Sequence, residues 1–250
     1  MLVKLLGKNL NDITPLLDKY NLTISESGSF DAVITHGGDG AMLGAERVYP
    51  GIPKFPIRDA ATAPTCPEHQ LEDRLEAFAA GKLALSSIPK VMASVNGKTM
   101  TAVNDVFLHN ADFASALRYR VMIDGELYAN EVAGDGVCLA TPHGSSAYYR
   151  SITHSLFRTG IGLAFSNSTE EVDHLVLADN SVVTVTITRG PGVLLADNSP
   201  ERIIVNEGDT VIFSKSDETA QIFDLAGFMC PKCRLLRHPN KLPFAGLKNQ

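Results

Sequence analysis

Short apolar runs alternate with amphipathic stretches through the first third of the chain. Helical signals lie at 11–20 and 67–80, where apolar residues recur every three or four positions between charged ones. The apolar runs predict short strands at 2–6, 22–25 and 32–35. Strands that alternate with helices predict an α/β domain with a parallel sheet over residues 1–88.

One apolar segment of this region carries two prolines. Residues 52–57 include Pro53 and Pro56, and a proline cannot donate a hydrogen bond to a neighbouring strand. The sequence therefore predicts an edge strand or an irregular segment there.

From about residue 90 the pattern changes to alternating strands and tight turns. Asn96-Gly97 and Asp124-Gly125 each separate two strand-like runs, which is typical of hairpins with type I′ turns. Valines and isoleucines alternate with threonines over 183–188, and a further hairpin is predicted over 203–213. We expect an all-β, sandwich-like domain over 90–222, with the tail 223–250 docked back on the α/β domain.

Composition and charge narrow the class of protein. The 250 residues are 44% hydrophobic and 20% charged, which is ordinary for a soluble globular chain. The net charge of −6 argues against a general nucleic-acid or anionic-membrane surface. Lys4 and Lys8 interrupt the N-terminal apolar run, and no stretch reaches the roughly 18 apolar residues of a membrane span. A cytoplasmic protein with reduced thiols is expected.

The strongest local motif follows the third predicted strand. Residues 31–43 read DAVITHGGDGAML, so an apolar strand runs into Gly37-Gly38-Asp39-Gly40 and then into a helix-like run. Glycine backbone N–H groups can approach an anion closely, and the positive end of the following helix would face the same point. Asp39 would lie where the anion is held, which suits a base or a metal ligand. The alternative is a plain glycine turn.

Two later stretches carry polar groups at predicted strand ends. Asn104-Asp105 offers donors and acceptors that could bind a ribose, or could form an Asx turn. Residues 134–148 read GDGVCLATPHGSSAY, a short strand between an Asp-Gly turn and a loop of small and hydroxyl residues that ends in Tyr148. This loop suits close approach of a ligand, or a helix N-cap.

Taken together, these motifs resemble the NAD kinase family. GGDG at 37–40, the Asn-acid pair at 104–105 and DG…TPxGSxAY at 135–148 occur in the family's order, and the resemblance covers about 30–215. It implies an NAD kinase-like fold and transfer of a phosphoryl group from ATP to the 2′-hydroxyl of the adenosine ribose of NAD. It also implies Mg²⁺ as the divalent ion, and a homodimer or homotetramer.

The resemblance also implies roles for individual residues. Asp39 would be the catalytic base, and Gly37, Gly38 and Gly40 would face the phosphates. The NAD-binding residues would be Asp39, Gly40, Asn104, Asp105, Asp135, His143, Ser146, Ala147, Tyr148 and Ser151. Asp135 would act from a neighbouring loop or from across a subunit interface.

Three positions depart from the family pattern. The usual glycine-rich stretch with a phenylalanine is absent at 52–65, His143 replaces a threonine, and the late Asp-Gly-Gln is approximated only by 197–199. Two alternatives therefore stay open. One is a related GGDG kinase with a lipid or sugar acceptor, although no glycine-threonine-glycine-asparagine-type stretch of lipid kinases is present. The other is a dinucleotide binder without activity.

Two further patterns are weighed and not adopted. Cys230-Pro-Lys-Cys233 is half of a zinc site, but its candidate partners Cys66, His69 and His238 are scattered along the sequence, so no metal ligands are assigned. Ser145 and His154 could suggest a hydrolase, but the chain lacks the GxSxG turn that would support one.

Overall fold

The computed structural model describes residues 1–112, 114–170 and 174–238, and the chain forms two compact units. The first unit comprises Met1–Ser87 and Ala220–Gln250, and the second comprises Ile88–Thr219. Strands β5 (Leu85–Val95) and β16 (Thr210–Phe223) each run from one unit into the other.

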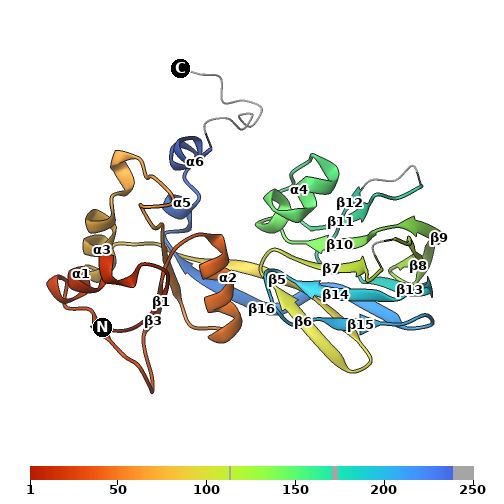
Figure 1. Ribbon diagram of the computed structural model, residues 1–250, viewed down its shortest axis with the longest axis horizontal. Helices are drawn as coiled ribbons and strands as arrows, with labels where there is room; N and C mark the ends of the chain where they lie inside the picture. The colour runs from red at the N-terminus through yellow and green to blue at the C-terminus, as the bar shows by residue number, and fades with distance from the viewer. Residues whose placement is uncertain (113, 171–173, 239–250) are drawn as a thin grey trace. The chain divides into compact units, whose positions relative to one another are not determined.

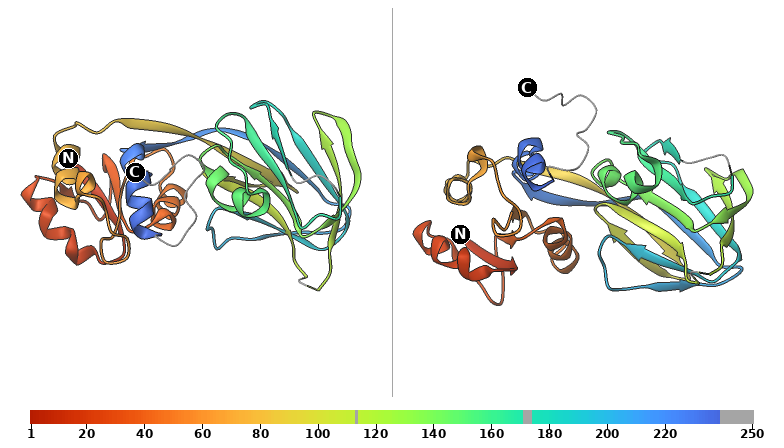
Figure 2. Two further views of the ribbon diagram at one scale, coloured as in Figure 1. Left: turned by 90° about the horizontal axis from the view of Figure 1, so that it is seen from above. Right: turned by 45° about the horizontal axis from the view of Figure 1, so that its top comes forward.

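The first unit is a parallel sheet with helices on both faces (Figures 1 and 2). Its strands lie in the order β2-β1-β3-β4, followed by the end of β16. Helices α1 and α3 cover one face and α2 covers the other. The elements are β1 (Leu2–Gly7), η1 (Leu10–Asp12), α1 (Thr14–Lys19), β2 (Thr23–Ile24), β3 (Ala32–His36), α2 (Asp39–Val48), β4 (Lys54–Ile57), η2 (Pro67–His69), α3 (Leu71–Ala79), α5 (Leu225–Phe228) and α6 (Pro231–Arg237).

The core of this unit explains why the short strands are stable. Apolar side chains of β1, β3 and β4 pack against those of α1 and α3. Val3 and Ile34 of the strands and Leu17 and Leu75 of the helices all have 0% of their surface exposed. All five residues of β3 are buried, as expected for a central strand that has helices on both faces. The glycine turn thus directly follows a fully buried strand.

The prediction for 52–57 is wrong, because β4 is an interior strand. It pairs with β3 on one side and with β16 on the other. The carbonyls of Pro53 and Ile57 accept hydrogen bonds from the N–H groups of Val33 and Gly37, on the side of β3. Backbone polar groups of successive residues in a strand point to opposite sides, so the backbone of Pro56 faces β16. Pairing with β16 involves only Lys54. The missing N–H of Pro56 therefore falls where that second ladder has already ended.

The second unit is a sandwich of antiparallel sheets. One sheet contains β9-β8-β13-β16 together with β5 and β6, and the other has the order β12-β11-β10-β7-β14-β15. Its further elements are β6 (Lys98–Ala102), β7 (Asp105–Asn110), β8 (Leu117–Ile123), β9 (Glu126–Gly134), β10 (Gly136–Ala140), η3 (Gly144–Ser146), α4 (Tyr148–Thr153), β11 (Ile161–Ser166), β12 (His174–Leu177), β13 (Val183–Arg189), β14 (Gly192–Ala196) and β15 (Ile203–Val205).

A single apolar cluster fills the space between these two sheets. It takes inward residues from both, such as Val121 and Val185 from one sheet and Leu108 and Leu163 from the other. A smaller cluster lies on the outer face of the six-stranded sheet, where Tyr149 of α4 packs with Phe107 and Cys138. The predicted fold class, a parallel-sheet α/β domain plus a β-sandwich, is confirmed.

Two of the three predicted hairpins are confirmed and one is wrong. Asn96-Gly97 and Asp124-Gly125 both have positive φ at the two central positions, as a type I′ turn requires. The runs 203–205 and 211–213 do not form a hairpin, because β15 pairs with β14 while β16 pairs with β13 in the other sheet. The Glu207-Gly208-Asp209 turn carries the chain between the two sheets.

The tail forms α5 and α6 within the first unit, and residues 239–250 of the predicted docking segment lie outside the described residues. Among the helices that the structure describes, none has the length and apolar character needed to cross a membrane.

Candidate functional site

The glycine motif forms the junction between β3 and α2 in the first unit. Strand β3 ends at His36, Gly37 has a φ of 150°, and Gly38 is the N-cap residue of α2. Asp39 is the first residue of that helix. The first turn of α2 and the positive end of its dipole therefore lie at the GGDG turn. This geometry suits an anion such as phosphate.

Asp39 is paired with an arginine that the sequence analysis did not identify. Arg58 Nη2 lies 3.0 Å from Asp39 Oδ1, and its guanidinium stacks 3.7 Å from the ring centre of Phe228. The Arg58 side chain is 7% exposed, whereas that of Asp39 is 59% exposed. Arg58 follows β4 directly, and the carboxyl ends of β3 and β4 meet at one edge of the sheet. An edge strand or irregular segment, as predicted for 52–57, would not place Arg58 at this edge of the sheet, whereas the interior strand β4 does.

A second arginine, Arg237 at the end of α6, lies within electrostatic reach of Asp39 and Arg58. Burial lowers the pKa of its guanidinium, Arg58 lowers it further, and Asp39 opposes the shift. Its Nη1 atom is buried and has no hydrogen-bond partner among the described residues. The GGDG turn is thus accompanied by two cationic side chains, one directly after β4 and one at the end of α6, that would attract an anion with several charges.

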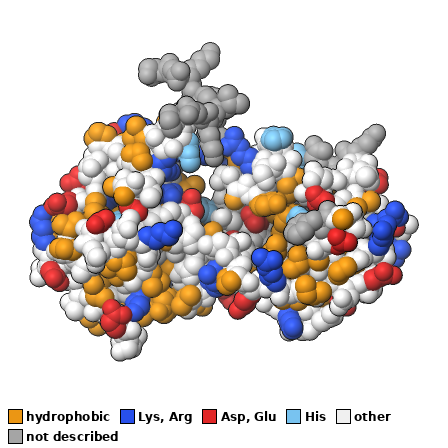
Figure 3. Space-filling view, viewed as in Figure 1, with side chains coloured by type: hydrophobic (Ala, Val, Ile, Leu, Met, Phe, Trp, Pro, Cys, Tyr) orange, Lys and Arg blue, Asp and Glu red, His pale blue; other side chains and the backbone are white. Residues whose placement is uncertain are grey.

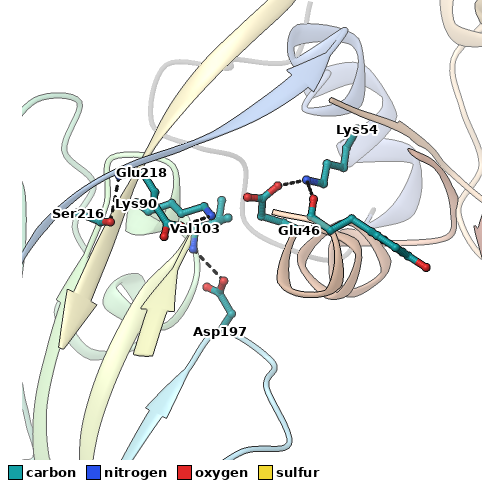
Figure 4. Close-up of polar contacts among 8 residues, drawn as sticks. Glu46, Lys54, Lys90, Val103, Asp197, Ser216 and Glu218 are labelled. Atoms are coloured by element: carbon teal, nitrogen blue, oxygen red, sulfur yellow. Dashed lines mark hydrogen bonds and ion pairs between the residues drawn. The ribbon is translucent and has the colours of Figure 1, made fainter. Parts of the chain in front are cut away.

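A buried ion pair ties the helix of this turn to the sheet. Lys54 of β4 is fully buried and forms an ion pair with Glu46 of α2, as Figure 4 shows. Lys54 Nζ also donates a hydrogen bond to the carbonyl of Tyr49. Because Lys54 lies four residues before Arg58 along the chain, this contact fixes α2 against the strand that leads to the arginine.

In the second unit, three chain segments converge around Asn104-Asp105. Ala140 pairs with Asp105, and Ala196 pairs with Val106, so the ends of β10 and β14 lie beside the start of β7. The Asp197 carboxylate accepts a hydrogen bond from the N–H of Val103 at 2.8 Å, as Figure 4 shows. It accepts a second one from the N–H of Asn104, also at 2.8 Å. A late aspartate, noted in the sequence only as an approximation to the family motif, therefore organises this turn.

The loop after β10 is joined to the same turn. Thr141 N–H donates to the carbonyl of Asn104 at 2.9 Å, and Thr141 Oγ1 donates to the carbonyl of Val103 at 2.7 Å. A Cβ on Gly144 would lie 2.0 Å from the Asn104 carbonyl oxygen, so only glycine allows this approach. The motifs at 104–105 and 141–148 are thus a single structural feature.

Asp105 is a buried acid at the centre of this feature. Only 8% of its surface is exposed. Burial and the charge of Asp197 raise the pKa of its carboxyl group to about 7, and a backbone hydrogen bond from Tyr148 partly opposes this increase. A carboxylate that is costly to ionise and lies beside a second carboxylate is typical of a functional site rather than of packing.

Replacing Asp105 with asparagine is expected to remove a pH-dependent loss of stability. The pKa of Asp105 is higher in the folded chain than in the unfolded chain. Between about pH 4 and pH 7 the Asp105 carboxyl group is therefore protonated in the folded chain and ionised in the unfolded chain, so the free energy of unfolding falls as the pH rises through that range. Above pH 7 the variant should therefore be more stable than the original chain by on the order of 4 kcal/mol, and this advantage should shrink toward pH 4.

Urea unfolding of both proteins across this pH range measures the difference. Asp217→Asn, a change at an exposed residue of β16, is the matched control and should show no such trend. Parallel pH curves for the original chain and Asp105→Asn would contradict the assignment.

Tyr148 lies between the Asn104-Asp105 turn and a cavity of about 460 Å³. Its ring packs against Phe107, with ring centres 4.9 Å apart. Burial raises the pKa of its phenol, and the nearby Cys138, Asp105 and Asp135 add to the shift. Ser151 and Asn167 also line the cavity. A half-exposed aromatic ring beside a polar cavity suits stacking on a flat heterocycle.

Asp135 lies at the opposite end of β10 from the Asn104-Asp105 turn. Since β10 has five residues, the two ends are roughly 17 Å apart. Asp135 Oδ2 accepts a hydrogen bond from Asn167 Nδ2 at 2.6 Å, and Asn167 lines the cavity beside Tyr148. Asp135 is therefore connected, through Asn167, to the cavity beside Tyr148 and not directly to Asn104.

The other predicted residues of the loop are held by local hydrogen bonds. Ser146 Oγ donates to the carbonyl of His143 at 3.5 Å, and Ser151 Oγ donates to that of Tyr148 at 2.7 Å. Ala147 is the N-cap residue of α4. The Ser145 hydroxyl is buried and serves the carbonyls of Pro142 and Phe157 within the protein.

The cysteines of the tail are close to residues that are distant in sequence. In the first unit, Cys66 and His69 lie next to Cys230 and Cys233, while His238 is outside this group.

On the face drawn in Figure 3, acidic and basic side chains are intermixed with apolar and neutral ones.

Comparisons with known proteins agree with the fold and the motifs. Residues 103–225 match the family profile of the ATP-NAD kinase C-terminal domain. An NAD kinase of Gemmatimonas aurantiaca is 28% identical over 245 residues, covering 91% of this chain and 82% of that protein.

Two solved structures are similar in fold. The first is an NAD kinase from Archaeoglobus fulgidus in complex with ATP, with a TM-score of 0.74, 17% identity and coverage of 92% of this chain and 96% of that one. The second is a yeast NADH kinase complexed with NADH, with a TM-score of 0.77, 16% identity and coverage of 98% and 88%.

Proposed function

Because the chain belongs to the NAD kinase family and is a phosphotransferase, we propose that it transfers a phosphoryl group from ATP to the 2′-hydroxyl of the adenosine ribose of NAD. The observation that carries the proposal is the GGDG turn at the start of α2, with Asp39 paired with Arg58 and within electrostatic reach of Arg237. An anion-binding helix end, a carboxylate and two arginines are the groups that phosphoryl transfer needs.

In this proposal the first unit handles the phosphates. The backbone at Gly38 and Gly40 would approach the phosphate oxygens, and Arg58 and Arg237 would neutralise negative charge. Gly37 would shape the turn, because its N–H donates a hydrogen bond to the carbonyl of Ile57 at 2.8 Å. Asp39 accepts the proton of the 2′-hydroxyl as the ribose oxygen bonds to the γ-phosphorus. The bond from that phosphorus to the bridging oxygen breaks, and ADP leaves with the electron pair. Asp39 then returns its proton to solvent. Positioning and charge stabilisation provide most of the catalysis.

The second unit supplies the groups for the dinucleotide. Asn104 and Asp105 would hydrogen-bond ribose hydroxyls, and the Tyr148 ring would stack on a base beside Ser151. Asp105 accepts such a hydrogen bond best when ionised, so dinucleotide affinity should fall as the pH drops below about 7. The roles of His143, Ser146 and Ala147, and of Asp135 through its own loop or a second subunit, stay predictions, as does the homo-oligomer.

Mg²⁺ is proposed to accompany ATP and to neutralise its phosphates. Among the described residues, the one group of three or more close His, Cys, Asp or Glu ligand atoms is the cysteine cluster, which is the wrong chemistry for magnesium. Asp39 is the acidic side chain of the glycine turn. The residues present thus fit an ion that is held mainly by phosphate and water.

An acceptor panel tests the proposed function. The purified chain is incubated with ATP, Mg²⁺ and one acceptor at a time: NAD, NADH, a diacylglycerol, a sphingoid base or a simple sugar. We expect phosphorylation of a dinucleotide, with the product identified as NADP or NADPH by a dehydrogenase specific for it. Phosphorylation of a lipid or sugar alone would overturn the proposal. So would dinucleotide binding by calorimetry without turnover, provided that a control kinase is active in the same buffer.

A further inference from the structure

Two four-residue motifs of the same pattern meet in the first unit. Residues 66–69 read CPEH and residues 230–233 read CPKC, so each begins with a cysteine and a proline and has a second metal-binding residue three positions after the cysteine. The first lies on η2 and the second begins α6. The two third-position residues, Glu68 and Lys232, form an ion pair at 2.5 Å, so the motifs face each other along their length.

The four candidate ligand atoms lie close together. Cys66 Sγ is 3.4 Å from Cys233 Sγ and 3.0 Å from His69 Nδ1, and all four ligand atoms, including that of Cys230, lie within 4.8 Å of one another. A tetrahedral zinc ion with Zn–S of about 2.3 Å holds its ligand atoms about 3.5–3.8 Å apart. The three cysteines are unbonded, and 3.4 Å is well beyond the roughly 2.05 Å of a disulfide.

The surroundings suit thiolates that bind a metal. Cys66, Cys230 and Cys233 are buried, with 3%, 6% and 2% of their surface exposed. The N–H of Cys66 donates to Cys233 Sγ at 3.3 Å, and the N–H groups of Lys232 and Cys233 donate to Cys230. Such N–H···S bonds stabilise negative charge on sulfur and hold the ligands in place.

Charge balance also fits a divalent ion. Three thiolates, a neutral histidine and one divalent cation leave a single negative charge. Lys232, Arg74 and Arg237 lie within electrostatic reach of the cluster sulfurs and can balance it.

We propose that Cys66, His69, Cys230 and Cys233 bind one zinc ion per chain. Three sulfur ligands and one nitrogen ligand fill a tetrahedral site, which leaves no position for a substrate and makes the site structural. The proposal does not rest on the proposed kinase activity.

The zinc site would position both arginines near Asp39, namely Arg237 and Arg58. Cys233 and Arg237 are four residues apart on α6, so they share one face of the helix. Phe228, whose ring stacks on Arg58, precedes Cys230 by two residues. An ion that binds Cys66 and His69 together with Cys230 and Cys233 would therefore clamp α5 and α6 to the loop that follows Arg58.

Metal content of the full chain, purified without chelator or polyhistidine tag, is the first test. Mass spectrometry of the metals should find about one zinc per chain in the original protein and in Cys138→Ala, which changes the one cysteine outside the cluster. Cys66→Ser and Cys233→Ser should lose it. His69→Cys, which completes a four-cysteine set, should retain it. Less than stoichiometric zinc that zinc addition and dialysis do not raise would overturn the proposal.

Cobalt substitution keeps the test decisive if the serine variants fail to fold. The original chain, stripped of metal under reducing conditions, should take up one equivalent of Co²⁺. It should then show the intense visible absorption of tetrahedral cobalt with thiolate-to-metal charge transfer, which zinc abolishes. Weak octahedral spectra, no saturation at one equivalent, iron–sulfur absorption in the purified chain, or a disulfide between Cys66 and Cys233 would overturn the proposal.

Discussion

Asp39→Asn is expected to lower kcat for NADP formation by about 10²–10⁴-fold while leaving the Kd for NAD nearly unchanged. Asparagine keeps the size of the side chain and can still accept a hydrogen bond from Arg58, but it cannot accept the proton of the 2′-hydroxyl. Because Asp39 is more than half exposed at the start of α2, the change should not disturb the core. The loss should therefore fall on turnover and not on folding.

Steady-state kinetics give kcat, and calorimetry gives the affinity for NAD. Asp73→Asn is the matched control, since Asp73 lies in the first turn of another helix of the same unit, α3. It should retain full activity. An unchanged kcat for Asp39→Asn would remove Asp39 from its role as the base, and an equal loss of NAD affinity would make it a binding residue instead.

Arg58→Ala is expected to lower kcat/KM for ATP by about 10²–10³-fold. The guanidinium holds Asp39 at 3.0 Å, stacks on Phe228 and carries a positive charge beside an anion-binding helix end. Arg58→Lys keeps the charge but not the planar stack or the paired donors, so it should recover only part of the activity.

The same kinetic assay with varied ATP, together with the melting temperature of each variant, separates lost catalysis from lost stability. Arg47→Ala is the matched control, because Arg47 is exposed in the last turn of α2, at the end of the helix away from Asp39. If Arg58→Ala and Arg47→Ala had equal kcat/KM values, Arg58 would have no part in handling the phosphates.

Much of the fold followed from local patterns. Alternating strands and helices in the first third, and Asn-Gly and Asp-Gly turns between alternating strands later, are features that neighbouring residues decide. The failures had non-local causes. Whether a proline-containing segment can lie inside a sheet depends on which side of the strand is paired, and that depends on β16, more than 150 residues away. Whether β15 and β16 form a hairpin depends on their partners β14 and β13.

For the candidate site, the sequence by itself determined the groups that are contiguous along the chain: the GGDG turn at a helix start, the Asn104-Asp105 pair and the loop that ends at Tyr148. Only the tertiary structure brought Arg58 and Arg237 to Asp39, Asp197 to the turn before β7, and Cys66 and His69 to Cys230 and Cys233. The physical reason is the range of the interactions. Turns and helix ends arise from a few adjacent residues, whereas charge pairing and metal coordination act between side chains that only the folded sheet and its docked tail bring together.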